Sequence, residues 1–121
     1  MSELEFNKND DNMRLLISEM KRRHNNISLG GGKKKIAKQH AKGKLTARER
    51  INYLKDKEAK FLEIGAFAGY EMYAEYGGCP AAGVVAGITY IKNIQCVIVA
   101  NDATVKAGAW FPISGKKNLR L

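Results

Sequence analysis

The sequence has few of the residues that build cross-linked or membrane-spanning proteins. Its 121 residues include 2 cysteines, 2 prolines and 1 tryptophan. Cys79 and Cys96 are too few and too isolated for a disulfide framework or a CxxC metal site, so we expect two reduced, packed thiols. No apolar run approaches the roughly 20 residues that cross a bilayer, and the polar opening MSELEFNKNDDNMR is unlike a secretory signal. We therefore expect a cytoplasmic protein without a membrane partner, or a mitochondrial matrix protein if the source is eukaryotic, although no transit peptide is visible.

The familiar catalytic constellations are missing as well. No Ser-His-Asp set, pair of acid/base carboxylates or HExxH motif is present, and Asp102 is better placed to fix a turn than to transfer a proton. His24 and His40 are the only histidines. A histidine on the apolar stripe of a helix more often packs against a neighbour than binds metal, so we expect neither catalytic side chains nor a metal site.

Acidic residues are scarce beside basic ones in the first half of the chain. Residues 1–60 carry 16 basic and 8 acidic side chains, whereas residues 61–121 carry 5 and 4. The stretch GGGKKKIAKQHAKGKLTARER, residues 30–50, holds eight Lys or Arg and one acid, Glu49. Such a surface indicates an anionic partner, and phosphorylated cofactors, nucleic acid and an acidic subunit all qualify.

Two specific interpretations of this basic stretch fail. A Walker loop needs Ser or Thr where Lys34 stands, and it follows a strand, whereas a helix is expected before Gly30. No aromatic residue lies between Gly30 and Arg50 to stack on a base, and no nucleic-acid-binding motif is present. We therefore expect no nucleic-acid partner.

Apolar spacing predicts three helices in the first half. Met13, Leu16, Ile17 and Met20 form one face of a helix over residues 9–26. The glycines 30–32 should break it, as a hinge or as the end of an arm. A basic helix over 33–42 follows, and the capping box Thr46-Ala47-Arg48-Glu49 starts a helix over 47–56.

The second half of the chain is predicted to be mostly strands and loops. Residues 61–64 form a short strand, and the Gly- and Tyr-rich residues that follow form an ordered loop. Residues 83–91 and 94–100 are β-branched runs joined by a Lys92-Asn93 hairpin turn. The later strand is apolar on both faces, so it should be central or covered on both sides. Ser114 should cap a terminal helix. The strands need more cover than these residues supply, so we expect the front part of a larger α/β domain.

Residues 101–109, NDATVKAGA, follow the apolar strand at the position where α/β folds place ligand-handling backbone. The combination of GKLTARERI (43–51), FLEIGAFAGY (61–70), GVVAGI (83–88) and VIVANDATVKAGAWFP (97–112) resembles the carboxyltransferase β subunit of biotin-dependent acyl-CoA carboxylases. Asp102-Ala103-Thr104-Val105 and the residues after it are more similar to the methylcrotonoyl branch than to the propionyl branch.

This resemblance implies a crotonase-like (ClpP/crotonase) α/β domain, of which residues 30–121 form the beginning and residues 1–29 a preceding helical arm. It also implies transfer of a carboxyl group from carboxybiotin to an acyl-CoA of the methylcrotonoyl or propionyl type. Biotin would sit on a separate carrier, a partner biotin carboxylase subunit would use ATP, and the full-length subunit would form a homo-oligomer. An enolate forms on such a substrate, so the chemistry depends on oxyanion-stabilising donors.

The resemblance further implies where ligand binds. The acyl-CoA cleft should include Asn101, Thr104, Lys106, Gly108 and Ala109. Lys116, Lys117 and Arg120 are candidates for the CoA phosphates, although a solvated basic face explains them equally well. The glycines and lysines of residues 30–42 would then be a linker and a helix on the outside of the oligomer. Because family members run to several hundred residues, we expect an N-terminal fragment that is inactive alone. The alternative is a non-catalytic binding or assembly module derived from such a subunit.

Overall fold

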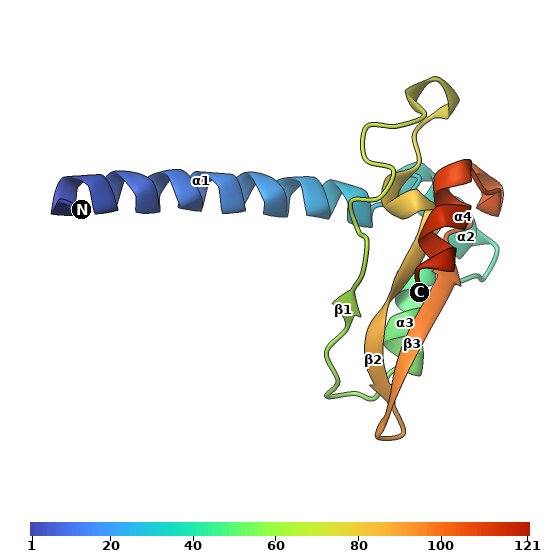
Figure 1. Cartoon of the computed structure of the whole chain (residues 1–121). Helices are drawn as coiled ribbons and strands as arrows, with labels where there is room; N and C mark the ends of the chain where they lie inside the picture. The colour runs from blue at the N-terminus through green and yellow to red at the C-terminus, as the bar shows by residue number, and fades with distance from the viewer.

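A long helix projects from a small body of strands and short helices (Figure 1). The structure, a computed structural model, describes residues 1–121. The helix, α1 (Glu3–Ser28), begins earlier than the predicted residue 9. Ser2 and Glu5 form a capping box in which the Glu5 N–H donates to Ser2 Oγ over 3.2 Å and the Ser2 N–H donates to Glu5 Oε2 over 2.9 Å. This box satisfies free amides of the first turn and so extends the helix toward the N-terminus.

Two shorter helices follow where the sequence predicts them, as α2 (Lys33–Ala41) and α3 (Ala47–Leu54). The capping box of α3 is confirmed, since the Thr46 N–H donates to Glu49 Oε2 over 2.7 Å and the Glu49 N–H donates to Thr46 Oγ1 over 3.3 Å. The buried face of α3 presents Ala47 and Ile51 to Val85 of the sheet. This small cluster holds the helix against one face of the strands.

Three antiparallel strands form the sheet in the order β1 (Leu62–Glu63), β2 (Val84–Ile91) and β3 (Ile94–Asn101). The predicted Lys92-Asn93 turn is confirmed, with φ of 48° and 65° at the two residues, as a type I′ hairpin requires. Asp56 stabilises the turn, because its carboxylate oxygens accept the Lys92 and Asn93 N–H groups over 2.6 and 2.8 Å.

The prediction that the later strand is central or covered is wrong for these residues. β2 lies in the middle of the sheet, and its Val84, Val85 and Ala86 are at most 1% exposed. β3 is an edge strand on which Val97 and Val99 remain 53% and 45% exposed. The reason is that α3 packs against only one face of β3, the face that carries Ile98 and Ala100.

The expected ordered loop between β1 and β2 is confirmed. It contains the 3₁₀ turns η1 (Ala74–Tyr76) and η2 (Pro80–Gly83). Cys79 lies in it as a buried free thiol, as expected, whereas the free thiol of Cys96 on β3 is only partly buried. None of the helices combines the length and apolar character that crossing a membrane requires.

The last helix, α4 (Pro112–Leu119), corrects the role expected of Ser114. The helix begins at Pro112, whose fixed φ suits a first helical position, so Ser114 lies inside the first turn and is not its cap. The Ser114 hydroxyl accepts from the Phe111 N–H over 3.1 Å and donates to the Ala82 carbonyl over 2.6 Å. Ser114 therefore ties α4 to the backbone that leads into β2.

Candidate functional site

The loop that follows β3 is fixed by its own polar side chains. Asp102 Oδ1 accepts both the backbone N–H of Thr104, over 2.9 Å, and the hydroxyl of Thr104, over 2.6 Å. The two side chains are 9% and 2% exposed. The prediction that Asp102 fixes a turn is confirmed. This buried pair sets the direction in which residues 103–109 leave the sheet.

The glycines between α1 and α2 pack directly against this turn. The Gly31 N–H donates to Thr104 Oγ1 over 2.9 Å. A Cβ at Gly31 would lie 1.8 Å from the Thr104 carbonyl oxygen, and one at Gly30 would lie 2.4 Å from Asp102 Oδ2. Only residues without side chains allow so close an approach. The glycines end the arm, as one of the two interpretations predicted, but they are held in a fixed contact and do not form a free hinge or linker.

Residues of the next turn adopt the left-handed conformation. In η3 (Lys106–Gly108), φ is 44° at Lys106, 55° at Ala107 and 85° at Gly108. Such values cost non-glycine residues of the order of 1–2 kcal/mol each, and they concentrate at ligand-handling sites. The Lys106 ammonium lies over the rings of Phe111 and Tyr76, 4.3 and 4.8 Å from their centroids. Cation–π attraction therefore holds the Lys106 side chain against the body.

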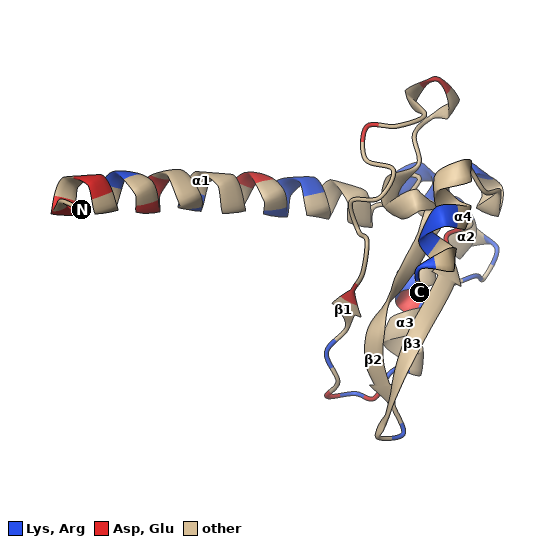
Figure 2. Ribbon diagram, in the orientation of Figure 1, with Lys and Arg blue, Asp and Glu red and all other residues tan.

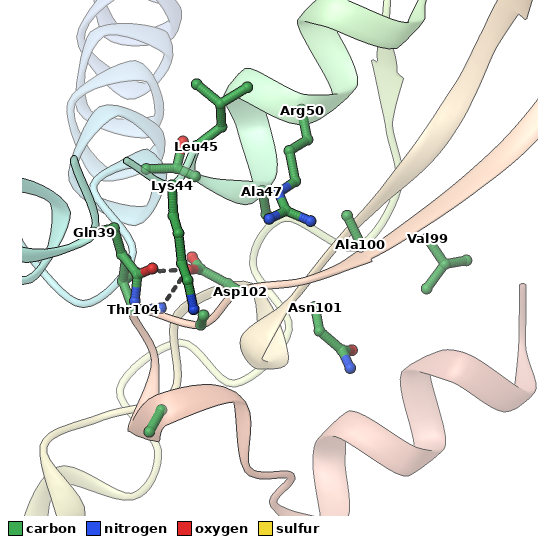
Figure 3. Close-up of a pocket in the computed structure, with 13 residues that line it drawn as sticks. Gln39, Lys44, Leu45, Ala47, Arg50, Val99, Ala100, Asn101, Asp102 and Thr104 are labelled. Atoms are coloured by element: carbon green, nitrogen blue, oxygen red, sulfur yellow. Dashed lines mark hydrogen bonds between the residues drawn. The ribbon is translucent and has the colours of Figure 1, made fainter. Parts of the chain in front are cut away.

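A cleft of about 540 Å³ opens between the α2–α3 segment and the end of β3 (Figure 3). Asn101 and Thr104 line it, together with Lys44 and Arg50, whose side chains point into the space from the opposite side. Asn101 is also restrained, because its Oδ1 accepts from Trp110 Nε1 over 3.2 Å. The cleft thus combines two cations with the polar start of the loop.

The cations of α4 line a different hollow. Lys116, Lys117 and Arg120 surround a space of about 150 Å³ beside Ile64 and Gly65. Lys117 is 7% exposed, and its Nζ donates to the Ala81 carbonyl over 2.8 Å and to the Val84 carbonyl. Burial lowers the pKa of Lys117 to about 8. In this structure Lys117 therefore donates hydrogen bonds to two backbone carbonyls, while Lys116 and Arg120 remain exposed.

The predicted site residues therefore fall into separate groups. Asn101 and Thr104 line the large cleft, Lys106 and Gly108 form the left-handed turn beside it with Ala109 directly after, and the α4 cations lie at the smaller hollow. Sequence reasoning missed Lys44 and Arg50, because it interpreted the segment that contains them only as the start of a capped helix and looked for the site after the later strand. The glycine tract, residues 30–32, was the available sequence signal that this part of the chain packs near the loop, since consecutive glycines allow the backbone to come close to another part of the chain.

An ion-paired cluster fixes the arm and α3 to the first strand. Arg48 donates through both Nη atoms to the Glu63 carboxylate, each over 2.8 Å. His24 Nε2 lies 3.3 Å from Glu63 Oε2, and the His24 ring lies near that of Phe67, so this histidine packs against neighbours as expected. Burial alone would raise the pKa of Glu63, but Arg48 and His24 hold it below its ordinary value.

The profile of the carboxyl transferase domain matches residues 38–121, which include the cleft, the loop and α4. The chain belongs to the carboxyl transferase domain family. The probable methylcrotonoyl-CoA carboxylase beta chain of Drosophila melanogaster is 42% identical over 116 residues, which cover 96% of this chain and 20% of that protein. The biotin-dependent 3-methylcrotonyl-coenzyme A carboxylase beta1 subunit of Mycobacterium tuberculosis is 40% identical over 110 residues, covering 91% of this chain and 20% of that protein.

Solved carboxyltransferase structures share the fold. The transcarboxylase 12S hexamer with methylmalonyl-coenzyme A bound matches with a TM-score of 0.80 and 32% identity, over 89% of this chain and 22% of that chain. The Pseudomonas aeruginosa geranyl-CoA carboxylase beta subunit matches with a TM-score of 0.76 and 29% identity, over 95% of this chain and 21% of that chain. The predicted crotonase-like carboxyltransferase fold is therefore confirmed. The chain spans about a fifth of the length of the curated relatives that it matches.

Proposed function

We propose that the chain is part of a carboxyltransferase subunit that transfers a carboxyl group from carboxybiotin to an acyl-CoA. The observation that carries this proposal is the family match over residues 38–121, which include the whole cleft lining and the whole loop after β3. Biotin would be presented by a separate carrier, and ATP would be used by a partner biotin carboxylase subunit. The preferred substrate is methylcrotonoyl-CoA, since relatives in Drosophila, Dictyostelium and Arabidopsis carry that enzyme's name.

The loop after β3 supports an acyl-CoA role through its backbone. Within the chain, the N–H groups of Lys106 and Ala107 donate to no acceptor. Free amides in a rigid turn can stabilise negative charge on a thioester oxygen or a phosphate, and they do so without an acid/base side chain. We therefore assign Asn101, Thr104 and residues 106–109 to the acyl-CoA cleft, with Asp102 and Thr104 positioning the turn.

The cations at the two hollows are the candidates for the CoA phosphates. Lys116 on α4 and Arg120 directly after it are exposed and free to reach an anion, whereas Lys117 would have to leave its two carbonyl acceptors. Lys44 and Arg50 form a second cationic pair at the large cleft. We assign the phosphate contacts to Lys116 and Arg120, because they belong to the segment that follows the loop directly in the sequence and are exposed.

A chimera tests the proposal directly. Residues 1–121 replace the matching segment of the Dictyostelium methylcrotonoyl-CoA carboxylase beta chain, which is 44% identical over 116 residues. We expect carboxylation of methylcrotonoyl-CoA in the presence of the biotin-carrying partner and ATP, and no turnover by the 121-residue chain alone. A properly assembled chimera without activity would contradict the proposal. Turnover by the isolated chain would overturn the expectation that it is inactive alone.

A non-catalytic assembly module is the second candidate, and the projecting α1 favours it. The helix offers an exposed surface outside the matched residues 38–121. Under this alternative the chimera is inactive, but the isolated chain binds a carboxylase subunit in a pull-down. As for location, the Drosophila and Dictyostelium relatives are named as mitochondrial. We propose the matrix for a eukaryotic source and the cytoplasm for a bacterial one.

A further inference from the structure

Two aromatic rings, and no acidic side chain, hold the Lys106 ammonium. It lies 4.3 Å from the centroid of the Phe111 ring and 4.8 Å from that of the Tyr76 ring. Glu71 and Glu75, the acidic residues of the β1–β2 loop (red in Figure 2), form no ion pair with it. The negative face of each ring attracts the cation. We call the rings of Tyr76 and Phe111 the aromatic cradle of Lys106.

The aromatic cradle joins two segments that are far apart in the sequence. Phe111 is 7% exposed and belongs to a buried cluster with Cys79 and Val105. The ring of Tyr73 stacks on Phe111, with the centroids 4.3 Å apart and the planes at 27°. Tyr76, also in the β1–β2 loop, is 61% exposed, and its ring centroid is 5.9 Å from that of Phe111. The loop therefore forms the outer wall of the cradle, and the core forms its base.

The backbone that the cradle supports is strained. Lys106 and Ala107 have φ of 44° and 55°, a left-handed conformation that favours glycine. The Gly108 N–H closes the turn by donating to the Val105 carbonyl over 2.9 Å. Strain of this kind persists only where the surrounding structure holds the residue in place. The Lys106 side chain, fixed in the cradle, supplies a further restraint of that kind.

We propose that Tyr76 is a positioning residue of the acyl-CoA site. Its ring holds the Lys106 side chain, which keeps the turn left-handed and fixes the orientation of the free N–H groups of Lys106 and Ala107. Ala107 lines the large cleft, whereas Tyr76 does not, so Tyr76 acts through Lys106 without contacting the ligand. This inference rests on the proposed function, in which those two amides stabilise negative charge on the acyl-CoA.

The consequence for catalysis follows from the placement of the amides. Donors that face a developing negative charge are effective only when they are held in position before the reaction. Without the Tyr76 ring, Lys106 can leave the left-handed region, and the two N–H groups turn with the backbone. Lys106→Gly would place a residue there that adopts the left-handed conformation without strain and needs no cradle. The effects of substitutions at Tyr76 and Lys106 should therefore be coupled.

NMR of the 121-residue chain tests the cradle and the turn without any assay of activity. The ε-methylene protons of Lys106 should resonate upfield of those of the other lysines, because the ring faces shield them. Tyr76→Leu should reduce this upfield shift and change the HN–Hα couplings of Lys106 and Ala107, which depend on φ. Tyr76→Phe keeps a ring face and should preserve both signals. The matched control is Tyr53→Leu, since Tyr53 is 87% exposed and forms no ring contact.

Two results in the chain alone would overturn the proposal. One is a wild-type Lys106 ε-methylene signal at the position of the other lysines, which would mean that the cradle does not form. The other is a Tyr76→Leu variant whose HN–Hα couplings at Lys106 and Ala107 are those of the wild type, which would mean that the turn keeps its conformation without the ring.

The chimera with the Dictyostelium beta chain measures the effect on catalysis. Tyr76→Leu should lower kcat at least about tenfold and change KM for methylcrotonoyl-CoA by less than about twofold, because the amides act on charge that develops in the transition state. Tyr76→Phe should retain kcat to within about twofold of the wild type, because it keeps the ring face. In the Lys106→Gly background, Tyr76→Leu should change kcat by less than about twofold.

These outcomes separate the positioning role from general damage and from the proposed function. If Tyr76→Leu lowers kcat equally with and without Lys106→Gly, the ring does not act through Lys106 and the proposal is wrong. Equal losses of kcat in Tyr76→Leu and Tyr76→Phe would also contradict it. A wild-type chimera without activity would contradict the proposed function, whereas NMR of the chain would still decide whether Tyr76 holds the turn.

Discussion

Gly31 donates its backbone N–H to Oγ1 of Thr104 over 2.9 Å, a contact between residues 73 positions apart. The same hydroxyl donates to Asp102 Oδ1 over 2.6 Å. One threonine therefore joins the end of the α1 arm to the turn that starts the proposed acyl-CoA loop. The fixed position of the glycine tract follows from this contact, and so does the direction of the loop.

Replacing Gly31 with Ala should be strongly destabilising. The added Cβ would lie 1.8 Å from the Thr104 carbonyl oxygen, so the backbone of the tract or of the turn has to move. We expect the free energy of unfolding to fall by about 2–4 kcal/mol, measured by urea denaturation. Gly115→Ala is the matched control, because nothing lies within 4 Å of its Cβ and the position is helical. That variant should be neutral or up to about 1 kcal/mol more stable. Equal effects at the two positions would contradict the contact.

The Thr104 hydroxyl should contribute more to the stability of the fold than the Thr104 methyl group. Thr104→Val keeps the shape of the side chain but leaves the Gly31 N–H without its acceptor, which costs about 1–3 kcal/mol when the group is buried. Thr104→Ser keeps the hydroxyl and should cost about 1 kcal/mol or less. Amide hydrogen exchange gives the specific readout, since the Gly31 amide should exchange faster in the Val variant only. Unchanged protection of Gly31 in Thr104→Val would show that the bond is unimportant.

Local signals in the sequence predicted the elements that depend on local interactions. The Thr46–Glu49 capping box forms its hydrogen bonds within four residues, and the Lys92-Asn93 turn depends on the backbone conformation of its own two residues. Their sequence patterns therefore predict them without knowledge of the rest of the fold. Ser114 was misread for a physical reason. Serine is a common cap, but here its hydroxyl bonds to Ala82, 32 positions away, and no local pattern reveals such a partner.

The candidate site was predictable only in part, because it is assembled from distant segments. The loop after β3 was found from its small polar residues and from the family resemblance. Its contacts with Gly30, Gly31, Lys44 and Arg50 are tertiary, and the basic segment gives the same sequence pattern whether it faces solvent or a cleft. The exposure of β3 could not be predicted either, because the apolar sequence of a strand does not show which of its two faces other residues of the 121-residue chain cover.

Acid should destabilise the fold partly through Glu63. Arg48 holds the pKa of Glu63 below its ordinary 4.5, against the opposing effect of burial. A carboxyl with a lowered pKa stabilises the fold fully above its unfolded pKa, and this contribution is lost as pH falls through the folded value. Arg48→Met should therefore lower the free energy of unfolding at pH 7 by about 2 kcal/mol and reduce the further loss below pH 4.5.

The control for this variant is Arg50→Met on the same helix, since Arg50 is exposed and forms no ion pair. It should change stability by less than about 0.5 kcal/mol and keep the wild-type response to acid. Urea denaturation between pH 3 and pH 7 measures both variants. A wild-type acid response in Arg48→Met would disprove the role of the pair.

Lys117 should make the fold more stable as the solution becomes mildly alkaline. Burial lowers its pKa from 10.5 to about 8. Between these values the unfolded chain binds more protons than the folded chain, so the free energy of unfolding rises with pH. We expect a contribution of about 1 kcal/mol between pH 7 and pH 9, which Lys117→Met should remove. Measurements stop at pH 9 because burial raises the pKa of the Cys79 thiol above its ordinary 9.0, which acts in the opposite direction at higher pH. The same slope in both proteins would show that the lysine titrates normally.

The α4 cations should control acyl-CoA binding in the active chimera. Lys116 and Arg120 are exposed beside the same hollow, and an ammonium or guanidinium in contact with a phosphate contributes a charge-assisted hydrogen bond. At low salt, Lys116→Ala/Arg120→Ala should raise KM for methylcrotonoyl-CoA about tenfold and leave kcat nearly unchanged, because the phosphates bind equally in the ground and transition states. The matched control is Lys57→Ala/Lys60→Ala, which removes two exposed cations from the segment between α3 and β1, a segment that lies away from α4 in Figure 1. If both double variants raise KM equally, the effect is one of net charge. If Lys44→Ala/Arg50→Ala raises KM and the α4 variant does not, the phosphates bind at the large cleft instead.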